Sequence, residues 1–481
     1  MRSHAPLPST LNIGSCERAG TQHLCLAVIA AAALGAAIQV RDGLYHPLGF
    51  LWLTVALFAA LLIFVLAPYR SVEFHLARRA PWLFAAAIAL NFFQLFTNPT
   101  IGSWHGIQAT RFSYAMLTIA FVFAMAVVFM PRAGRLFLVL LTIVFCIIGA
   151  WIIRSVPRPY MDVWMLQTEG LKAFRSGHNP FAAVFADVYH RPELYATGAL
   201  KDGLVHQGFP YPPMVFWMDL PGYVLGGDYR WSNLAEIALA GILIAFARPQ
   251  SRYGPMAAAL FLFTPRVFFV LESGWTEPAT ILLLAATVFF ACRLRWLMPV
   301  FLGLFLCSKQ YLVWAIPPII LLAGRPVEWK RLARVLSVAL VAGCVASLPL
   351  ILWDMRAFVT ANFGIADIAA FRMDALSYLA LFANTMHRVP SGQTATLIGF
   401  TAAALATLLA TLRGQRTPAG YALAVTVGHL VFFAFYKFAF CNYYYFLIAA
   451  FCCGTGAMRI SSQGTAVSAS EPRTLGSSAR S

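Results

Sequence analysis

The chain has 481 residues, of which 60% are hydrophobic and only 11% are charged. A soluble protein carries about 25% charged residues, so this composition excludes a cytosolic enzyme, a nucleic-acid-binding module and a disordered protein. The net charge of +17 is therefore attributed to membrane topology and not to a nucleic-acid partner. Apolar blocks of about 16 to 20 residues are long enough to cross a hydrocarbon core of about 30 Å. The sequence predicts an all-α, polytopic membrane protein.

Apolar blocks bounded by charges or by Pro and Gly predict about fourteen transmembrane helices. The two short blocks at 297–307 and 311–323 could instead form one broken helix. Residues 1–23 are predicted as a cytoplasmic segment, 24–135 as four additional helices, 136–458 as the transmembrane core and 459–481 as a disordered cytoplasmic tail. The predicted spans are 24–40, 50–66, 81–97, 112–130, 136–153, 232–247, 255–271, 277–292, 297–307, 311–323, 333–351, 394–412, 420–437 and 442–458.

Basic residues gather in alternate loops, for example Arg132 with Arg135 and Arg413 with Arg416. The positive-inside rule then places both termini in the cytoplasm and the two long loops, 154–231 and 352–393, on the extracytoplasmic side. Most acidic residues fall on that outer side. We therefore expect a multi-pass protein of a bacterial inner (plasma) membrane whose chemistry takes place outside the cytoplasm.

The first outer loop contains two segments with helical periodicity, 161–176 and 214–224, predicted to be amphipathic helices that lie on the membrane face and cover a cavity. Asp162 lies about nine residues beyond the fifth predicted span, near the outer membrane boundary. A carboxylate in a partly dry site has a raised pKa and can accept a proton from a hydroxyl group. An N-cap or an interfacial charge is the alternative interpretation of Asp162.

Several short motifs follow one another along 136–458. They are Asp162, Gly177-x-Asn179-Pro180-Phe181, Tyr211-Pro212-Pro213 with Pro221, Trp275-Thr276-Glu277-Pro278, Gly303-x-x-x-x-Ser308-Lys309-Gln310 and the aromatic run Lys437 to Tyr445. In this order they resemble the GT-C superfamily of integral-membrane glycosyltransferases, in the style of the bacterial polyprenyl-phosphate-mannose-dependent mannosyltransferases. The resemblance implies transfer of a sugar from a polyprenyl-phosphate donor to a glycan or lipid acceptor, usually with inversion, with Asp162 as the base. The family often has a second acid beside the first, and Glu169 is a poor substitute for it, so dependence on a divalent metal stays open.

A departing phosphate needs a fixed cation in a water-poor site. Lys309, in a short connection between apolar helices, is the leading candidate for this phosphate contact. Snorkelling of long cationic side chains to the headgroup region is the alternative interpretation. Arg266, Arg372, Arg388 and Lys437 are further candidate phosphate contacts, and Glu277, Tyr211 and Asn179 are candidate substrate-binding residues.

Each of the other candidates also has a structural interpretation. Glu277 followed by Pro278 is typical of an ordinary helix start, and the tyrosines are typical of an interfacial belt. His178, His190 and His206 do not show the spacing of metal ligands, so no metal site is predicted.

Two other functions remain open from the sequence. A transporter or flippase of lipid-linked sugars would be expected to carry ionisable residues in mid-span and paired broken helices. A ligase that joins a whole lipid-linked glycan to an acceptor would share the outer site.

Overall fold

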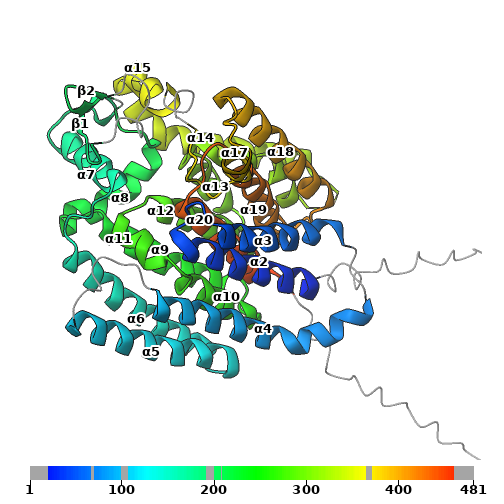
Figure 1. Cartoon of the computed structure of the whole chain (residues 1–481). Coiled ribbons are helices and arrows are strands. Elements are labelled where there is room, and N and C mark those ends of the chain that lie inside the picture. Colours follow the sequence, from blue (N-terminus) through cyan, green and yellow to red (C-terminus); the bar gives the residue numbers. More distant parts are fainter. Residues whose placement is uncertain are drawn as a thin grey trace, which may run out of the picture.

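The computed structural model describes residues 20–66, 70–98, 107–190, 200–206, 208–324, 326–364 and 371–459. Within these ranges the chain is helical, apart from one sheet of three two-residue strands and a single β-bridge. The all-α prediction is therefore confirmed for the described residues (Figure 1). Most of the predicted N-terminal segment 1–23 and all but the first residue of the predicted tail 459–481 lie outside the described residues.

Seven helices are long and apolar enough to cross a membrane, which makes the chain a polytopic membrane protein. A bent pair, α10 (Tyr253–Leu262) and α11 (Val267–Ser273), meets at 51° and would form an eighth span. The seven are α2 (Gly20–Arg41), α3 (Pro47–Val65), Arg79–Thr97 of α4 (Arg70–Thr97), Ala109–Phe129 of α5 (Ile107–Phe129), α6 (Gly134–Ser155), α14 (Trp329–Trp353) and α18 (Gly392–Arg413).

The remaining predicted spans coincide with shorter helices. Four of them have 17 residues each: α9 (Arg230–Phe246), α12 (Glu277–Arg293), α19 (Pro418–Ala434) and α20 (Cys441–Ala457). A 17-residue helix rises about 25 Å, slightly less than a hydrocarbon core. Every residue of α19 except Pro418, and nearly every residue of α20, is buried, so these two helices form the centre of the bundle. The described residues thus contain seven or eight candidate spans by length and composition, and the total of about fourteen stays a prediction.

The segment 297–323 forms a hairpin and not one broken span. It consists of α13 (Met298–Leu306) followed by two 3₁₀ segments, η4 (Gln310–Ala315) and η5 (Pro317–Leu322). Gln310 at the tip donates hydrogen bonds to the Pro210 carbonyl and to Asn362, whereas Gly324 at the end accepts one from Arg416. α13 packs closely on α14, since a side chain at Gly303 would clash with the backbone of that helix. This packing holds the hairpin tip, with Lys309, in place.

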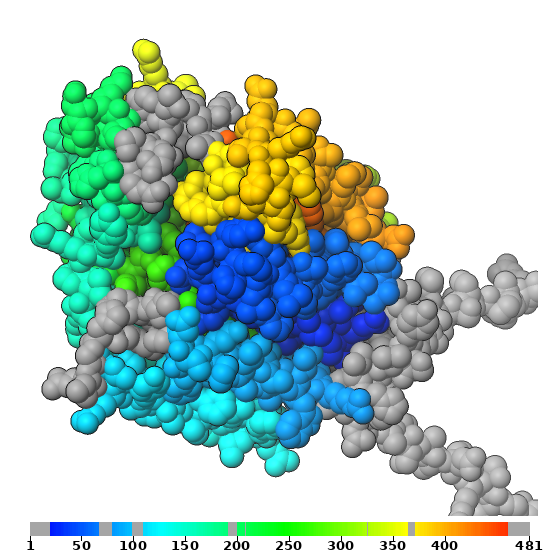
Figure 2. Space-filling model, in the orientation of Figure 1, coloured from blue at the N-terminus to red at the C-terminus, as the bar shows by residue number. Residues whose placement is uncertain are grey.

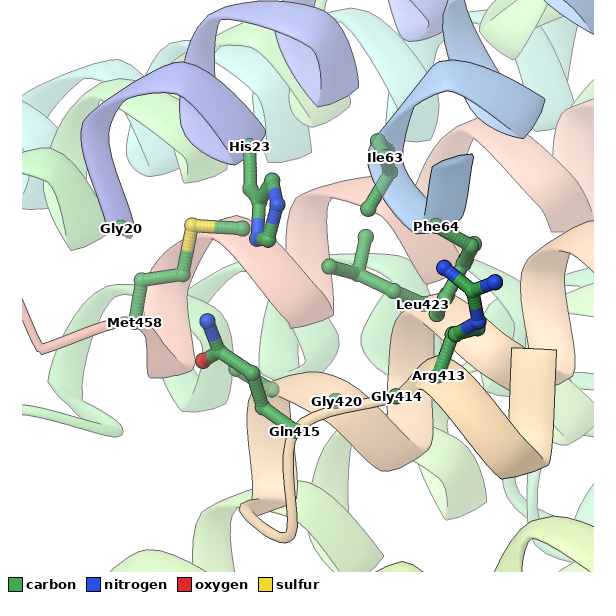
Figure 3. A pocket seen from close by; sticks show the side chains of 11 residues that line it. Gly20, His23, Ile63, Phe64, Arg413, Gly414, Gln415, Gly420, Leu423 and Met458 are labelled. Carbon is green, nitrogen blue, oxygen red and sulfur yellow. The ribbon is translucent and has the colours of Figure 1, made fainter. Parts of the chain in front are cut away.

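One end of the molecule is marked by a small cavity of about 20 Å³ (Figure 3). It is lined by Gly20 and His23 of α2, by Phe64 of α3, by Arg413 and by Met458. The start of α2 and the ends of α3, α18 and α20 therefore meet at this end. The basic loop at 413–417, predicted to be cytoplasmic, lies here together with Met458, the residue that follows α20.

The two long predicted outer loops meet at the opposite end. The first contains α7 (Asp162–Arg175), the 3₁₀ turn η2 (Pro180–Ala182), α8 (Pro213–Gly226) and an antiparallel sheet in the order β1 (Phe185–Ala186), β3 (Leu204–Val205), β2 (Leu200–Lys201). Both predicted amphipathic helices are confirmed as helices α7 and α8; the sheet was not predicted. The second loop contains α15 (Met355–Val359), the π-helical turn η6 (Thr360–Gly364) and α17 (Tyr378–Met386).

These two loops contact each other and the N-terminal helices. α15 packs on η2, and both lie in the same corner as α7 and α8 (Figure 1). Leu44, just after α2, forms the β-bridge with Ala375, and Figure 2 shows the yellow segment after residue 370 beside the blue N-terminal helices. Residues from both loops and from the first helices thus lie at one end of the bundle.

Candidate active site

Asp162 is the first residue of α7, close to the point where the chain leaves α6. Its carboxylate accepts hydrogen bonds from the Tyr189 hydroxyl (3.0 Å) and from the Val163 N–H (2.8 Å). Burial raises the pKa of Asp162, while the Tyr189 hydrogen bond and the positive charge of Arg372 act in the opposite direction. Met161, and not Asp162, is the N-cap of α7. A half-buried carboxylate with a raised pKa has the properties of a general base.

Arg372 lies within electrostatic reach of Asp162, although 210 positions separate the two in the sequence. Its guanidinium forms a bidentate ion pair with Asp374 (2.8 and 2.7 Å) and lies 4.7 Å from the centroid of the Phe440 ring. The Arg372 side chain remains 29% exposed. A planar guanidinium that keeps accessible N–H groups is suited to a phosphate oxygen.

Tyr211 lies between the acid at the start of α7 and the acid at the start of α12. Burial raises its pKa, and the negative charges of Asp162 and Glu277 raise it further. Tyr443, near the start of α20, lies within electrostatic reach of the same two acids and of Arg372. The sequence prediction therefore named residues from four distant segments that do come together at one end of the fold.

Glu277 and Lys309 form a buried ion pair next to Tyr211. The Lys309 ammonium donates to Glu277 Oε1 at 2.9 Å and to Thr276 Oγ1 at 2.6 Å, and it lies 4.8 Å from the centroid of the Tyr211 ring. Glu277 is 1% and Lys309 6% exposed. Glu277 is also the first residue of α12 and precedes Pro278, so the helix-start interpretation holds alongside the ion pair. Lys309 is thus engaged by protein partners and not directed at open space.

Two further buried acids lie behind this ion pair, and the sequence analysis did not single them out as site residues. Asp219 of α8 accepts a hydrogen bond from Gln167 at 2.6 Å, and Glu236 of α9 lies within electrostatic reach of it. Burial and the charge of Glu236 raise the pKa of Asp219, whereas Lys309 lowers it. The sequence does indicate these two acids, because a carboxylate within an apolar helix is costly and marks a candidate functional position.

The other predicted site residues each have their own partners or exposure. Arg266 is 2% exposed, and its guanidinium binds Asp42 at 2.7 Å and the carbonyls of Gln39 and Asn98. It therefore joins the break between α10 and α11 to the ends of α2 and α4.

Asn179 accepts a hydrogen bond from the Phe181 N–H at 2.9 Å and caps η2. Lys437 is 1% exposed, lies 6.0 Å from the centroids of the Tyr436 and Phe438 rings, and its carbonyl accepts a hydrogen bond from the Arg372 N–H. Arg388 is exposed beyond the end of α17.

A cavity of about 290 Å³ lies between the two long loops. Phe181 and Gly208 line it from the first loop, and Asp354, Arg356 and Thr360 line it from the second. In the part of the chain that the structure describes, no group of three His, Cys, Asp or Glu side chains is arranged to hold a metal ion.

The fold and its candidate spans define a polytopic helical membrane protein. No family model matches this chain, and neither curated proteins nor solved structures show a significant similarity to it. Any assignment of activity therefore depends on the site itself.

Proposed function

We propose that this protein is a membrane glycosyltransferase of GT-C type that transfers a sugar from a polyprenyl-phosphate donor to a glycan or lipid acceptor. The observation that supports it best is the convergence of Asp162, Arg372 and the Glu277–Lys309 pair around Tyr211. A base and cations in a partly dry site are what glycosyl transfer from a lipid phosphate requires. The proposal includes about fourteen spans in a bacterial inner membrane, both termini in the cytoplasm and an extracytoplasmic site.

Asp162 is the proposed base. It would take the proton of the acceptor hydroxyl as that oxygen bonds to the anomeric carbon and the phosphate leaves with the bonding electron pair. Inversion follows from a single displacement of this kind. Tyr189 would hold the carboxylate in position through its hydrogen bond.

Arg372 is better placed than Lys309 to contact the donor phosphate directly. It is partly exposed and already within electrostatic reach of Asp162. Lys309 would have to give up Glu277 or Thr276, and an anion beside it would lie close to the Glu277 carboxylate. We therefore assign Lys309, with Glu277 and Tyr211, to the wall that contacts the sugar, and retain Lys437 as a support of Arg372 through its carbonyl.

The cavity between the two long loops is the proposed acceptor site. Its volume of about 290 Å³ is near the lower end of the range of small-molecule pockets, about 300–1,000 Å³. Polar groups of Asp354, Arg356 and Thr360 line it together with the Phe181 ring, which is a combination suited to sugar hydroxyls and ring faces.

The test uses the purified full chain in lipid with radiolabelled polyprenyl-phosphate sugars and extracted envelope lipids and glycans as acceptors. Asp162→Asn is expected to lower the rate about 10²- to 10⁴-fold, the usual contribution of a general base. Glu169→Gln is the matched control, because Glu169 is a half-exposed acid of the same helix paired only with Lys172 among the described residues. Product formation by Asp162→Asn at the wild-type rate would refute the assignment of the base.

A transporter of lipid-linked sugars is the second candidate. Two observations favour it: the α10–α11 pair is bent at a break, and Asp219 and Glu236 are buried acids. The two functions separate in detergent micelles, which have no compartments. A new glycosidic bond formed there requires an enzyme, whereas sugar-lipid movement in proteoliposomes without any new bond would indicate the transporter.

A further inference from the structure

A second cavity lies at the opposite end of the fold from Asp162, between two basic turns. Its volume is about 200 Å³. One wall is the turn that joins α5 to α6, with Arg132 and Arg135, and the other is the turn that joins α9 to α10, with Gln250, Ser251 and Arg252. No acidic residue lines it among the described residues. Arg132 and Arg135 on one wall, with no acidic residue among the described lining residues, favour an anion.

Aromatic rings contact two of the arginines that line the cavity. Arg135 lies 5.6 Å from the centroid of the Phe246 ring, and Arg252 lies 5.1 Å from that of Tyr253. Contact with a ring face restrains the plane of a guanidinium while leaving N–H groups at its edge.

The cavity lies at headgroup depth. Both α5 and α6 are candidate membrane spans, so the turn between them is at a membrane boundary. Phe129, Met130 and Leu136 flank the cavity on this turn and are 48%, 54% and 61% exposed. Exposed apolar side chains beside arginines are suited to a phospholipid, because the arginines can bind its phosphate and the apolar side chains can contact its acyl chains.

An apolar groove continues from the cavity along the seam between α6 and α9. It is lined by Val139, Ile143, Ile147 and Ala150 on one face of α6 and by Ile242 of α9, with a volume of about 350 Å³. Val139 lies one turn beyond Arg135, and Ile242 lies one turn before Phe246, so the groove and the cavity share a face. From residue 139 to 150 the helix rises about 16 Å, a length suited to most of an acyl chain.

We propose that this seam binds one anionic membrane phospholipid, with its phosphate on Arg132 and Arg135 and one acyl chain in the α6 groove. The site is separate from the proposed catalytic centre and does not depend on the proposed function. A zwitterionic lipid would fit the groove equally well but would bring no net negative charge to the two arginines.

The test titrates the full chain in neutral detergent with a fluorescent phosphatidylglycerol. Phosphatidylcholine with the same chains and inorganic phosphate serve as competitors. Arg132→Gln with Arg135→Gln is expected to weaken phosphatidylglycerol binding about 25-fold, since each basic residue near a membrane surface is worth about fivefold. Arg293→Gln with Arg295→Gln is the matched control, an exposed pair on the α12–α13 turn outside the cavity.

Preference for phosphatidylglycerol over phosphatidylcholine, lost in the cavity variant and kept in the control, supports the proposal. Ala150→Phe, which fills the groove, should weaken both lipids alike. Equal losses in the two arginine variants would mean general surface charge and overturn the proposal. Competition by inorganic phosphate as strong as that by the lipid would overturn it as well, because the site would then serve a soluble anion.

Discussion

Replacing Lys309 by methionine tests how much the buried Glu277–Lys309 ion pair contributes to the stability of the protein. The two charged atoms are 2.9 Å apart and both side chains are at most 6% exposed. At an effective dielectric constant of about 20, their attraction is about 6 kcal/mol, opposed by the cost of removing both charges from water. Removing one partner leaves the other charge uncompensated, which costs about 3–5 kcal/mol.

The expected change in melting temperature follows from the size of the chain. Unfolding entropy is about 2.1 cal/mol/K per residue, or about 1 kcal/mol/K for 481 residues. Lys309→Met should therefore lower Tm by about 3–5 °C in detergent, measured by far-UV circular dichroism. Adding Glu277→Gln should recover part of that loss, because the second change removes the unpaired charge.

An exposed ion pair of the same chain serves as the control. Glu169 and Lys172 are 3.3 Å apart on α7, with side chains 44% and 65% exposed. Such pairs contribute about 0–1 kcal/mol, so Lys172→Met should change Tm by less than about 1 °C. An unchanged Tm for Lys309→Met, or a double variant that loses the full sum of the two single losses, would refute the reasoning.

Three further predictions concern single side chains. Tyr189→Phe removes a hydrogen bond that lowers the pKa of Asp162, so that pKa rises further and the acid limb of the pH profile of kcat/KM moves to higher pH; an unmoved limb would contradict the role of this bond. Asn179→Ala removes a helix cap, which should cost about 1 kcal/mol in unfolding free energy and leave the KM values unchanged; a raised KM would restore Asn179 as a binding residue. Arg266→Gln removes the buried ion pair with Asp42 and should lower Tm with little effect on donor KM, whereas a selective rise in donor KM would favour Arg266 as a phosphate contact.

Much of the fold follows from the hydropathy pattern and from the Gly and Pro residues at which helices begin or end. The predicted helices 161–176 and 214–224 correspond to α7 and α8, because periodicity and the Gly177 and Pro213 boundaries are local signals. The number of membrane spans was less accessible, because hydropathy does not separate a 17-residue helix buried in protein from one in lipid. For the same reason, hydropathy alone does not distinguish two short spans from one broken helix in the segment that forms α13, η4 and η5.

The structure brings several of the predicted site residues near one another, and their roles stay predictions. Asp162 lies within electrostatic reach of Arg372 and Tyr211, and Tyr211 lies within reach of Glu277 and contacts Lys309. The acid with which each cation pairs depends on long-range packing, and no local sequence pattern predicts that pairing.

Two examples show the effect of packing on the candidate cations. Arg266 pairs with Asp42, which directly follows α2 and lies 224 positions earlier in the chain. Lys309 pairs with Glu277 and is buried, because the packing of α13 on α14 holds the hairpin tip against the start of α12.

The hydrogen bonds of Gln310 join segments that are synthesised at different times. This amide bridges the Pro210 carbonyl of the first loop and Asn362 of the second, and Tyr443 reaches the same place from the last helix. A nascent chain that has emerged through its first 320 residues thus carries Asp162, Glu277 and Lys309 but lacks Arg372 and Tyr443. The candidate site is therefore completed only when the last helix packs, so chains released before residue 443 should lack part of it, and reporter fusions belong after Met458.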